Sequence, residues 1–139
     1  MVRVIFDTNI IVSALLRSGS LPDAALRLAV NHVVQMCVSE PVLREYEEVL
    51  SRTKLGIPGE KTATALAQIR RASMLVSPSS PVKACRDSDD DIFLECAQAA
   101  HADYLLTGNI RHFPKSWFNT RVVTARQFVE IMIDVQFGK

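Results

Sequence analysis

Acidic and amide side chains recur along this chain at positions where they could act on one ligand. Asp7 follows an apolar run, Glu45 lies in a helical stretch, residues 87–91 form an acidic run, and Asn109 follows a later apolar run. Carboxylates gathered in one place repel one another unless a cation neutralises them, and hard divalent ions prefer oxygen ligands. If folding joins these positions, the chemistry they favour is Mg²⁺- or Mn²⁺-assisted attack on a phosphate.

Each of these positions also has a purely structural interpretation. The triplet Asp7-Thr8-Asn9 is typical of a turn into a helix that Thr8 or Asn9 caps. Acids at 87–91 favour a helix N-terminus, so we expect one or two of them to be structural. Glu45 and the two glutamates that soon follow it could simply form the solvated face of a helix.

The elements that must position these residues alternate along the chain. Short apolar runs predict strands at 2–6, 33–38, 74–76, 104–106 and 120–125. Apolar residues at helical spacing predict helices at 10–15, 21–29, 40–50, 61–72, 92–100 and 127–135. Ser39 is the expected N-cap of the third helix. This alternation predicts an α/β fold whose mostly parallel sheet is covered by helices on both faces.

Such a sheet has one edge at which ligands bind, beyond the carboxyl ends of its strands. Asp7 and Asn109 both follow predicted strands directly or within three residues. The fold itself would therefore bring both residues to the functional edge.

Composition sets the class of protein. The chain has 139 residues, 48% hydrophobic and 22% charged, with a net charge of +1. We predict one domain over 1–139 without a strongly basic nucleic-acid-binding coat. The three cysteines lack metal-site spacing, so we expect reduced core thiols. No run approaches the ~20 apolar residues of a membrane helix, and no signal peptide precedes the first strand, so we expect a cytoplasmic protein without membrane contact.

Four segments in order resemble the PIN domain family. They are VIFDTNIIVSALL, SEPVLREYEEVL, DSDDDIFLECAQAAHADYLLTGN and the HFP that follows, and the resemblance runs from Val2 to about Val135. It is strongest for the branch described as toxin components of prokaryotic toxin–antitoxin systems. The resemblance implies a three-layer α/β/α sandwich and a ribonuclease that holds Mg²⁺ or Mn²⁺ on clustered acids. It also implies an antitoxin protein as partner, and homodimers are common among such proteins.

The same resemblance implies roles for individual residues. Asp7 matches the first-strand metal ligand and Glu45 the mid-chain acid. The third catalytic and metal-binding acid is Asp90 or Asp91, and the D-x-x-D spacing from Asp87 slightly favours Asp90. The supporting residues would be Thr8, Asn9, Asp87, Thr107, Gly108 and Asn109.

Asn109 departs from the family pattern, in which an aspartate often follows the Thr-Gly pair. An amide can orient water or coordinate through its oxygen, but it adds no negative charge. We therefore expect one tightly held ion, with a second recruited by the substrate.

An aromatic and basic loop at 110–120 follows Asn109. Arg111, His112 and Lys115 are candidate substrate-binding residues, because cations interleaved with aromatics suit phosphate binding and base stacking. The alternative is that aromatic side chains pin the loop to the core, namely those of Phe113, Trp117 and Phe118.

Three functions compete at this stage. The leading hypothesis is a metal-dependent endoribonuclease that hydrolyses RNA phosphodiester bonds as the toxin of a toxin–antitoxin pair. The second is a catalytically weakened PIN-like module that binds RNA or protein, which Asn109 keeps open. The third, less favoured, is a phosphoryl-transfer domain with Asp7 as nucleophile, because no second aspartate completes a D-x-D signature.

Overall fold

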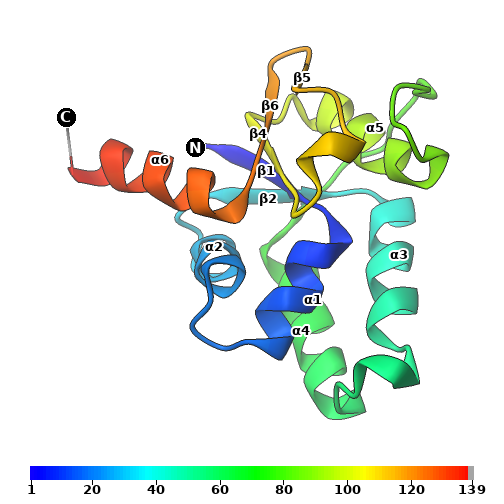
Figure 1. Cartoon of the computed structure of the whole chain (residues 1–139), viewed down its shortest axis with the longest axis vertical. Coiled ribbons are helices and arrows are strands. Elements are labelled where there is room, and N and C mark those ends of the chain that lie inside the picture. The colour runs from blue at the N-terminus through cyan, green and yellow to red at the C-terminus, as the bar shows by residue number, and fades with distance from the viewer. Residues whose placement is uncertain (138–139) are drawn as a thin grey trace.

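A six-stranded sheet organises residues 1–137, the part of the chain that this computed structural model describes (Figure 1). The strands lie in the order β3-β2-β1-β4-β6-β5. Their bounds are β1 Arg3–Phe6, β2 Gln35–Val38, β3 Met74–Leu75, β4 Tyr104–Leu106, β5 Ser116–Trp117 and β6 Thr120–Val123. Only the pairing of β5 with β6 is antiparallel, so the predicted mostly parallel sheet is confirmed.

β1 lies inside the sheet, between β2 and β4. Val4, Ile5 and Phe6 are fully buried, although consecutive residues of a strand point to opposite faces. Both faces of the sheet must therefore be covered, which is why the strand is a continuous apolar run rather than an alternating one.

Helices supply the two outer layers. In Figure 1, α5 lies above the strands, whereas α1 and α2 lie below them. α5 packs on β1, β2 and β4, and α2 packs on α1 and α6. The bounds are α1 Thr8–Leu16, α2 Leu21–Val30, α3 Glu40–Leu50, α4 Gly59–Ala72, α5 Asp91–Ala100 and α6 Ala125–Phe137. The predicted three-layer α/β/α architecture is confirmed.

The helix starts near the site differ in their capping. The amide of Val42 donates to Oγ of Ser39 at 3.3 Å, which confirms Ser39 as the N-cap of α3. The structural alternative for Thr8 and Asn9 is wrong, because both lie inside α1. Asp7 is the residue at the N-cap position, and its side chain makes no capping hydrogen bond there.

The segment predicted to be an irregular loop contains more structure than expected. A 3₁₀ turn at Ile110–His112 is followed by β5, the short antiparallel edge strand. A further 3₁₀ turn, η2, spans Ser88–Asp90 in the acidic run and leads into α5. These two turns bring both candidate loops to the end of the sheet where β1 and β4 finish.

Other expectations concern thiols, membranes and chain extent. All three cysteines are free, with Cys37 and Cys96 buried and Cys85 half-buried. Across residues 1–137, no helix combines the length and apolar character needed to cross a membrane. The single domain predicted for 1–139 stays a prediction, and residues 138–139 lie outside the described part.

Candidate active site

The ends of β1 and β4 bring Asp7 and Thr107 side by side. The amide of Asp7 donates to the carbonyl of Leu106 at 2.9 Å, which continues the pairing of the two strands by one residue. The hydroxyl of Thr107 donates to Oδ2 of Asp7 at 2.7 Å, and both side chains are buried. We call this end of the sheet, defined by Asp7 and Thr107, the carboxyl edge.

Glu45 reaches the carboxyl edge from α3. β2 runs parallel to β1, so the helix that follows β2 begins at the same edge. Oγ1 of Thr8 donates to Oε2 of Glu45 at 3.1 Å. Because Thr8 directly follows Asp7, this bond holds the carboxylate of Glu45 close to Asp7.

The electrostatics of Asp7 reflect these surroundings. Burial is the main cause that raises the pKa of Asp7 above its ordinary value, and the hydrogen bond from Thr107 opposes the rise. The negative charge of Glu45 raises the pKa further. An ionised carboxylate at this position is therefore stabilised by any cation that binds beside it.

Asp90 joins the group from the end of η2. Burial, followed by the charges of Asp7 and Asp87, raises the pKa of Asp90 to about 6, and Glu45 adds to the rise. His112 opposes the shift, with its Nδ1 3.7 Å from Oδ2 of Asp90. Three acids from distant parts of the sequence thus act on one another at the carboxyl edge.

Asp91, the neighbour of Asp90, has a different environment. It is buried, and its Oδ1 accepts hydrogen bonds from the amides of Ala84 at 3.1 Å and Cys85 at 2.8 Å. Burial raises the pKa of Asp91, but these hydrogen bonds outweigh it and leave the pKa below its ordinary value. The carboxylate of Asp91 therefore holds the segment before η2, whereas the acids that act on Asp90 are Asp7, Asp87 and Glu45.

Asp87 also has a structural bond. Its Oδ1 accepts from the amide of Asp89 at 2.9 Å and caps η2. The expectation that one or two acids of this run are structural is confirmed by Asp87 and Asp91. Asp87 still acts on the site, because its charge contributes to the raised pKa of Asp90.

The turn after β4 is tied to the start of α1. The amide of Gly108 donates to Oδ1 of Asn9 at 3.1 Å, and the amide of Asn109 donates to Oγ1 of Thr107 at 3.0 Å. Thr107 thus accepts from Asn109 while it donates to Asp7. Of the predicted supporting residues, Asn9, Thr107, Gly108 and the backbone of Asn109 belong to this hydrogen-bond network, whereas Thr8 bonds to Glu45 and Asp87 to the amide of Asp89. Asn109 itself is exposed.

The basic loop combines exposed cations with anchored aromatics. Arg111, His112 and Lys115 are exposed, and His112 lies against Asp90. Their role in binding substrate stays a prediction. Phe113 is buried in edge-to-face contact with Phe93. The indole of Trp117 donates to Oε1 of Gln98 at 3.0 Å. These two aromatics do pin the loop to the core.

The same interpretation is wrong for Phe118. Its side chain is 74% exposed, and its backbone is left-handed with φ of 54°. It follows β5 directly, in the turn that leads into β6, rather than pointing into the core.

Tyr46 borders the site, although the sequence indicates it only as part of the predicted helix at 40–50. Its side chain is fully buried, and its hydroxyl donates to the carbonyl of Phe6, the residue before Asp7. The signal was available in principle, because a phenol in a buried stripe needs a hydrogen-bond acceptor that a leucine would not need.

The donors at the carboxyl edge suit a hard divalent ion, because they are carboxylate and amide oxygens. Within residues 1–137, no three His, Cys, Asp or Glu side chains are grouped as a ready metal site. Mg²⁺ usually keeps several waters and takes only one or two carboxylates from the protein. The residues therefore fit a partly hydrated ion rather than a closed protein cage.

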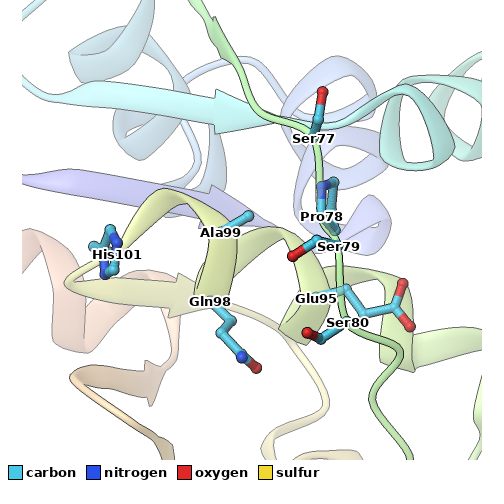
Figure 2. Close-up of a pocket in the computed structure, with 8 residues that line it drawn as sticks. All are labelled: Ser77, Pro78, Ser79, Ser80, Glu95, Gln98, Ala99 and His101. Atoms are coloured by element: carbon cyan, nitrogen blue, oxygen red, sulfur yellow. The ribbon is translucent and has the colours of Figure 1, made fainter.

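A separate cavity of about 340 Å³ lies between the segment 77–80 and the second half of α5. Figure 2 shows the side chains that line it. Its lining includes Glu95, Gln98 and His101, and none of the predicted site residues contributes to it. The cavity is thus separate from the acids of the carboxyl edge.

Comparisons with known proteins were made for sequence and for fold. A family model described as PIN domain matches residues 3–111. An uncharacterized protein of Methanocaldococcus jannaschii, MJ1680, is 29% identical over 114 residues, which cover 78% of this chain and 71% of that protein.

Three solved structures are similar in fold. VapBC2 from Rickettsia felis, bound to a DNA fragment from its promoter, has a TM-score of 0.60 at 18% identity over 88% of this chain and 98% of that one. FitAB bound to the IR36 DNA fragment has a TM-score of 0.55 at 14% identity, covering 88% and 94%. The T. brucei RRP44 PIN domain has a TM-score of 0.52 at 13% identity, covering 98% and 83%.

The sequence identities to these three structures are low, so the similarity shows the fold alone. The family assignment depends on the match to the family model. That match begins in β1 and ends in the loop after β4, and so spans Asp7, Glu45, the acidic run and Asn109. On this match the chain belongs to the PIN domain family.

Proposed function

We propose that this protein is a metal-dependent endoribonuclease that hydrolyses RNA phosphodiester bonds. PIN domains are generally nucleases that use divalent metal ions, which supports hydrolase activity. The observation that carries the proposal is the placement of Asp7, Glu45 and Asp90 at one edge of the sheet, where Thr107 bonds to Asp7 and Thr8 bonds to Glu45. Burial, and after it the neighbouring carboxylates, raises the pKa of Asp7 and of Asp90. Like charges kept together at a cost in stability point to a ligand of opposite charge.

Asp7, Glu45 and Asp90 would hold the ion, which is Mg²⁺ or Mn²⁺. When bound, it would polarise the scissile phosphate and lower the pKa of an attacking water. In this proposal Thr107 orients the carboxylate of Asp7, and Thr8 orients that of Glu45. Asp91 is left to its two backbone amides.

The exposed cations beyond the edge would bind the RNA backbone. Arg111 and Lys115 are exposed in the loop that Phe113 and Trp117 anchor, so their backbone is held while their side chains can move. His112, which lies beside Asp90, would bind a phosphate next to the three acids. The exposed amide of Asn109 can orient a water or the substrate, in line with one tightly held ion and a second that arrives with the substrate.

A cleavage assay tests the proposal. Purified protein is incubated with single-stranded and structured RNA in Mn²⁺, in Mg²⁺ and in EDTA, beside Asp7→Asn and the matched control Asp134→Asn. Asp134 is exposed near the end of α6, so its substitution leaves the carboxyl edge intact. We expect metal-dependent cleavage by the wild type and by Asp134→Asn only, and equal cleavage by Asp7→Asn would contradict the proposal.

A binding module without cleavage is the second candidate. Asn109 in place of an acid, together with the lack of three grouped metal ligands in residues 1–137, favours it. The same samples distinguish the two, because this candidate retards RNA in a gel at equal strength with EDTA and never shortens it. Acyl-phosphate trapped on Asp7 would instead indicate phosphoryl transfer.

We further propose that this chain acts as a toxin and that an antitoxin protein binds it. The similarity in fold to VapBC2 and to FitAB, each described in a DNA-bound form, supports such an assembly. Expression of the chain alone should arrest growth, and co-expression of the adjacent gene should restore it. Growth that is unaffected by a well-expressed wild-type protein would contradict the toxin role.

A further inference from the structure

Tyr46 follows Glu45 in α3, but its side chain is buried in the core whereas Glu45 is half-buried. It is among the largest fully buried side chains, and no water reaches its hydroxyl. Burial also raises its pKa well above 10, so the phenol stays protonated and acts as a donor. A buried hydroxyl without an acceptor is destabilising, so its partner determines where α3 can lie.

That partner is the carbonyl of Phe6 at the end of β1. β2 pairs with β1 only at Arg3 and Val4, so the sheet does not extend on that side to Phe6. The hydroxyl of Tyr46 thus donates a hydrogen bond to the carbonyl of Phe6, at a position of β1 where β2 provides no partner. This bond joins α3 to the peptide unit that leads into Asp7.

Two consecutive residues of α3 therefore bond to the two neighbours of Asp7. Tyr46 bonds to Phe6 on one side, and Glu45 accepts from Thr8 on the other. Both bonds cross between the same two parts of the chain, at the point where the carboxylates of Asp7 and Glu45 repel each other.

We propose that Tyr46 is a positioning residue, whose hydroxyl holds the Glu45 turn of α3 against the Asp7 end of β1. This inference rests on the proposed function and assigns to Tyr46 the spacing of two metal-binding carboxylates before the ion arrives. Tyr46 touches neither substrate nor ion. Its effect passes through the backbone of Phe6 and through the adjacent Glu45.

The test compares Tyr46→Phe with Thr120→Val. Thr120 is a matched control, because its buried hydroxyl also donates to a backbone carbonyl, that of Ala102, at 2.6 Å. It lies at the start of β6, at the opposite end of the sheet from Asp7. Both variants are studied at a temperature at which circular dichroism shows them folded.

Mn²⁺ binding by calorimetry is the first readout. We expect Tyr46→Phe to weaken Mn²⁺ binding about 10-fold and to lower kcat while KM for RNA is kept, as residues that orient metal ligands do. Thr120→Val should bind Mn²⁺ like the wild type. Insertion of 4-aminophenylalanine at position 46, which restores a donor, should recover part of the loss. Equal Mn²⁺ affinity in Tyr46→Phe, Thr120→Val and wild type would overturn the inference.

Hydrogen exchange separates this inference from the proposed function. If the wild type binds no Mn²⁺, the proposed metal-dependent function is wrong. The exchange rate of the Asp7 amide then still tests whether Tyr46 positions α3 against β1. We expect that amide, which donates to Leu106, to exchange about 10-fold faster in Tyr46→Phe than in Thr120→Val. Equal exchange in both variants would overturn the positioning role.

Discussion

The two ends of the central strands are built on opposite principles. At the amino end, the amide of Arg3 donates to Oδ2 of Asp103 at 2.8 Å, and its guanidinium donates to the carbonyl of Ala100 at 2.8 Å. The carboxylate of Asp103 and the guanidinium of Arg3 thus each have a hydrogen-bond partner in the backbone. At the carboxyl edge, burial and like charges raise the pKa of both Asp7 and Asp90.

This difference fits the proposed function, in which the amino end stabilises the fold and the carboxyl edge binds an ion. Unfavourable charge is retained in folded proteins mainly where a ligand needs it. The hydrogen bonds from Thr107 and Thr8 hold the acids of the carboxyl edge in place without neutralising them. A cation is the group that would neutralise them.

Substitution of one aspartate at each end should break the comparison most clearly. We expect Asp7→Asn to lower metal-dependent RNA cleavage about 100- to 1000-fold, because it removes a charge that acts on the reacting phosphate through the ion. Asp103→Asn should leave kcat/KM unchanged. Initial rates on a fluorescent RNA measure both, and comparable losses in the two variants would refute the contrast.

Added metal should stabilise the protein only if the carboxyl edge is intact. At an Mn²⁺ concentration about 100 times Kd, the free energy of unfolding should rise by about 2.7 kcal/mol in the wild type. Asp103→Asn should show the same gain and Asp7→Asn almost none. Urea denaturation with Mn²⁺ and with EDTA gives these values, and a gain that survives in Asp7→Asn would place the ion elsewhere.

The acidic run offers a contrast between neighbouring residues. Asp91→Ala should lower the free energy of unfolding by about 2 kcal/mol, because it leaves the amides of Ala84 and Cys85 without their charged acceptor. The exposed Asp89, whose side chain caps nothing, supplies the control Asp89→Ala with little change. Guanidinium denaturation compares them, and equal stabilities would mean that Asp91 is not a structural group.

The smallest expected effect is a pH dependence of the metal-free protein. The pKa of Asp90 is about 6 in the fold and 3.8 ordinarily, so the folded state binds this proton more tightly. Its contribution to stability is full below 3.8 and is lost as pH rises through about 6. Thermal unfolding in EDTA should therefore show the wild type gaining stability between pH 7 and pH 5 relative to Asp90→Asn. A constant difference would contradict the repulsion at this edge.

Much of the fold could be predicted because hydrophobic periodicity is local. Continuous apolar runs such as the one before Asp7 gave the buried strands, and Ser39 gave a helix start that the structure has. β5 was missed because Ser116 and Trp117 have no strand periodicity of their own and pair only with β6. That pairing depends on a turn through the exposed Phe118, which local sequence does not encode.

The candidate site was predictable only in part. The rule that ligands bind beyond strand ends predicted Asp7 and Asn109 at one edge of the sheet. In the structure, Thr107 links the two, because it donates to Asp7 and accepts from the amide of Asn109. Sequence could not separate Asp90 from Asp91, because a shift of one residue at a 3₁₀ turn decides which carboxylate faces the other acids and which faces two amides. The tie between Tyr46 and Phe6 depends on packing across the sheet. The homodimer and the cytoplasmic location stay predictions.

Crystals soaked in Mn²⁺ and measured at its absorption edge test the central claim most directly. We predict one anomalous peak at the carboxyl edge, with Asp7, Glu45 and Asp90 holding the ion directly or through water. Full Mn²⁺ occupancy at another surface, or no peak at the carboxyl edge at a concentration that supports cleavage, would contradict the account.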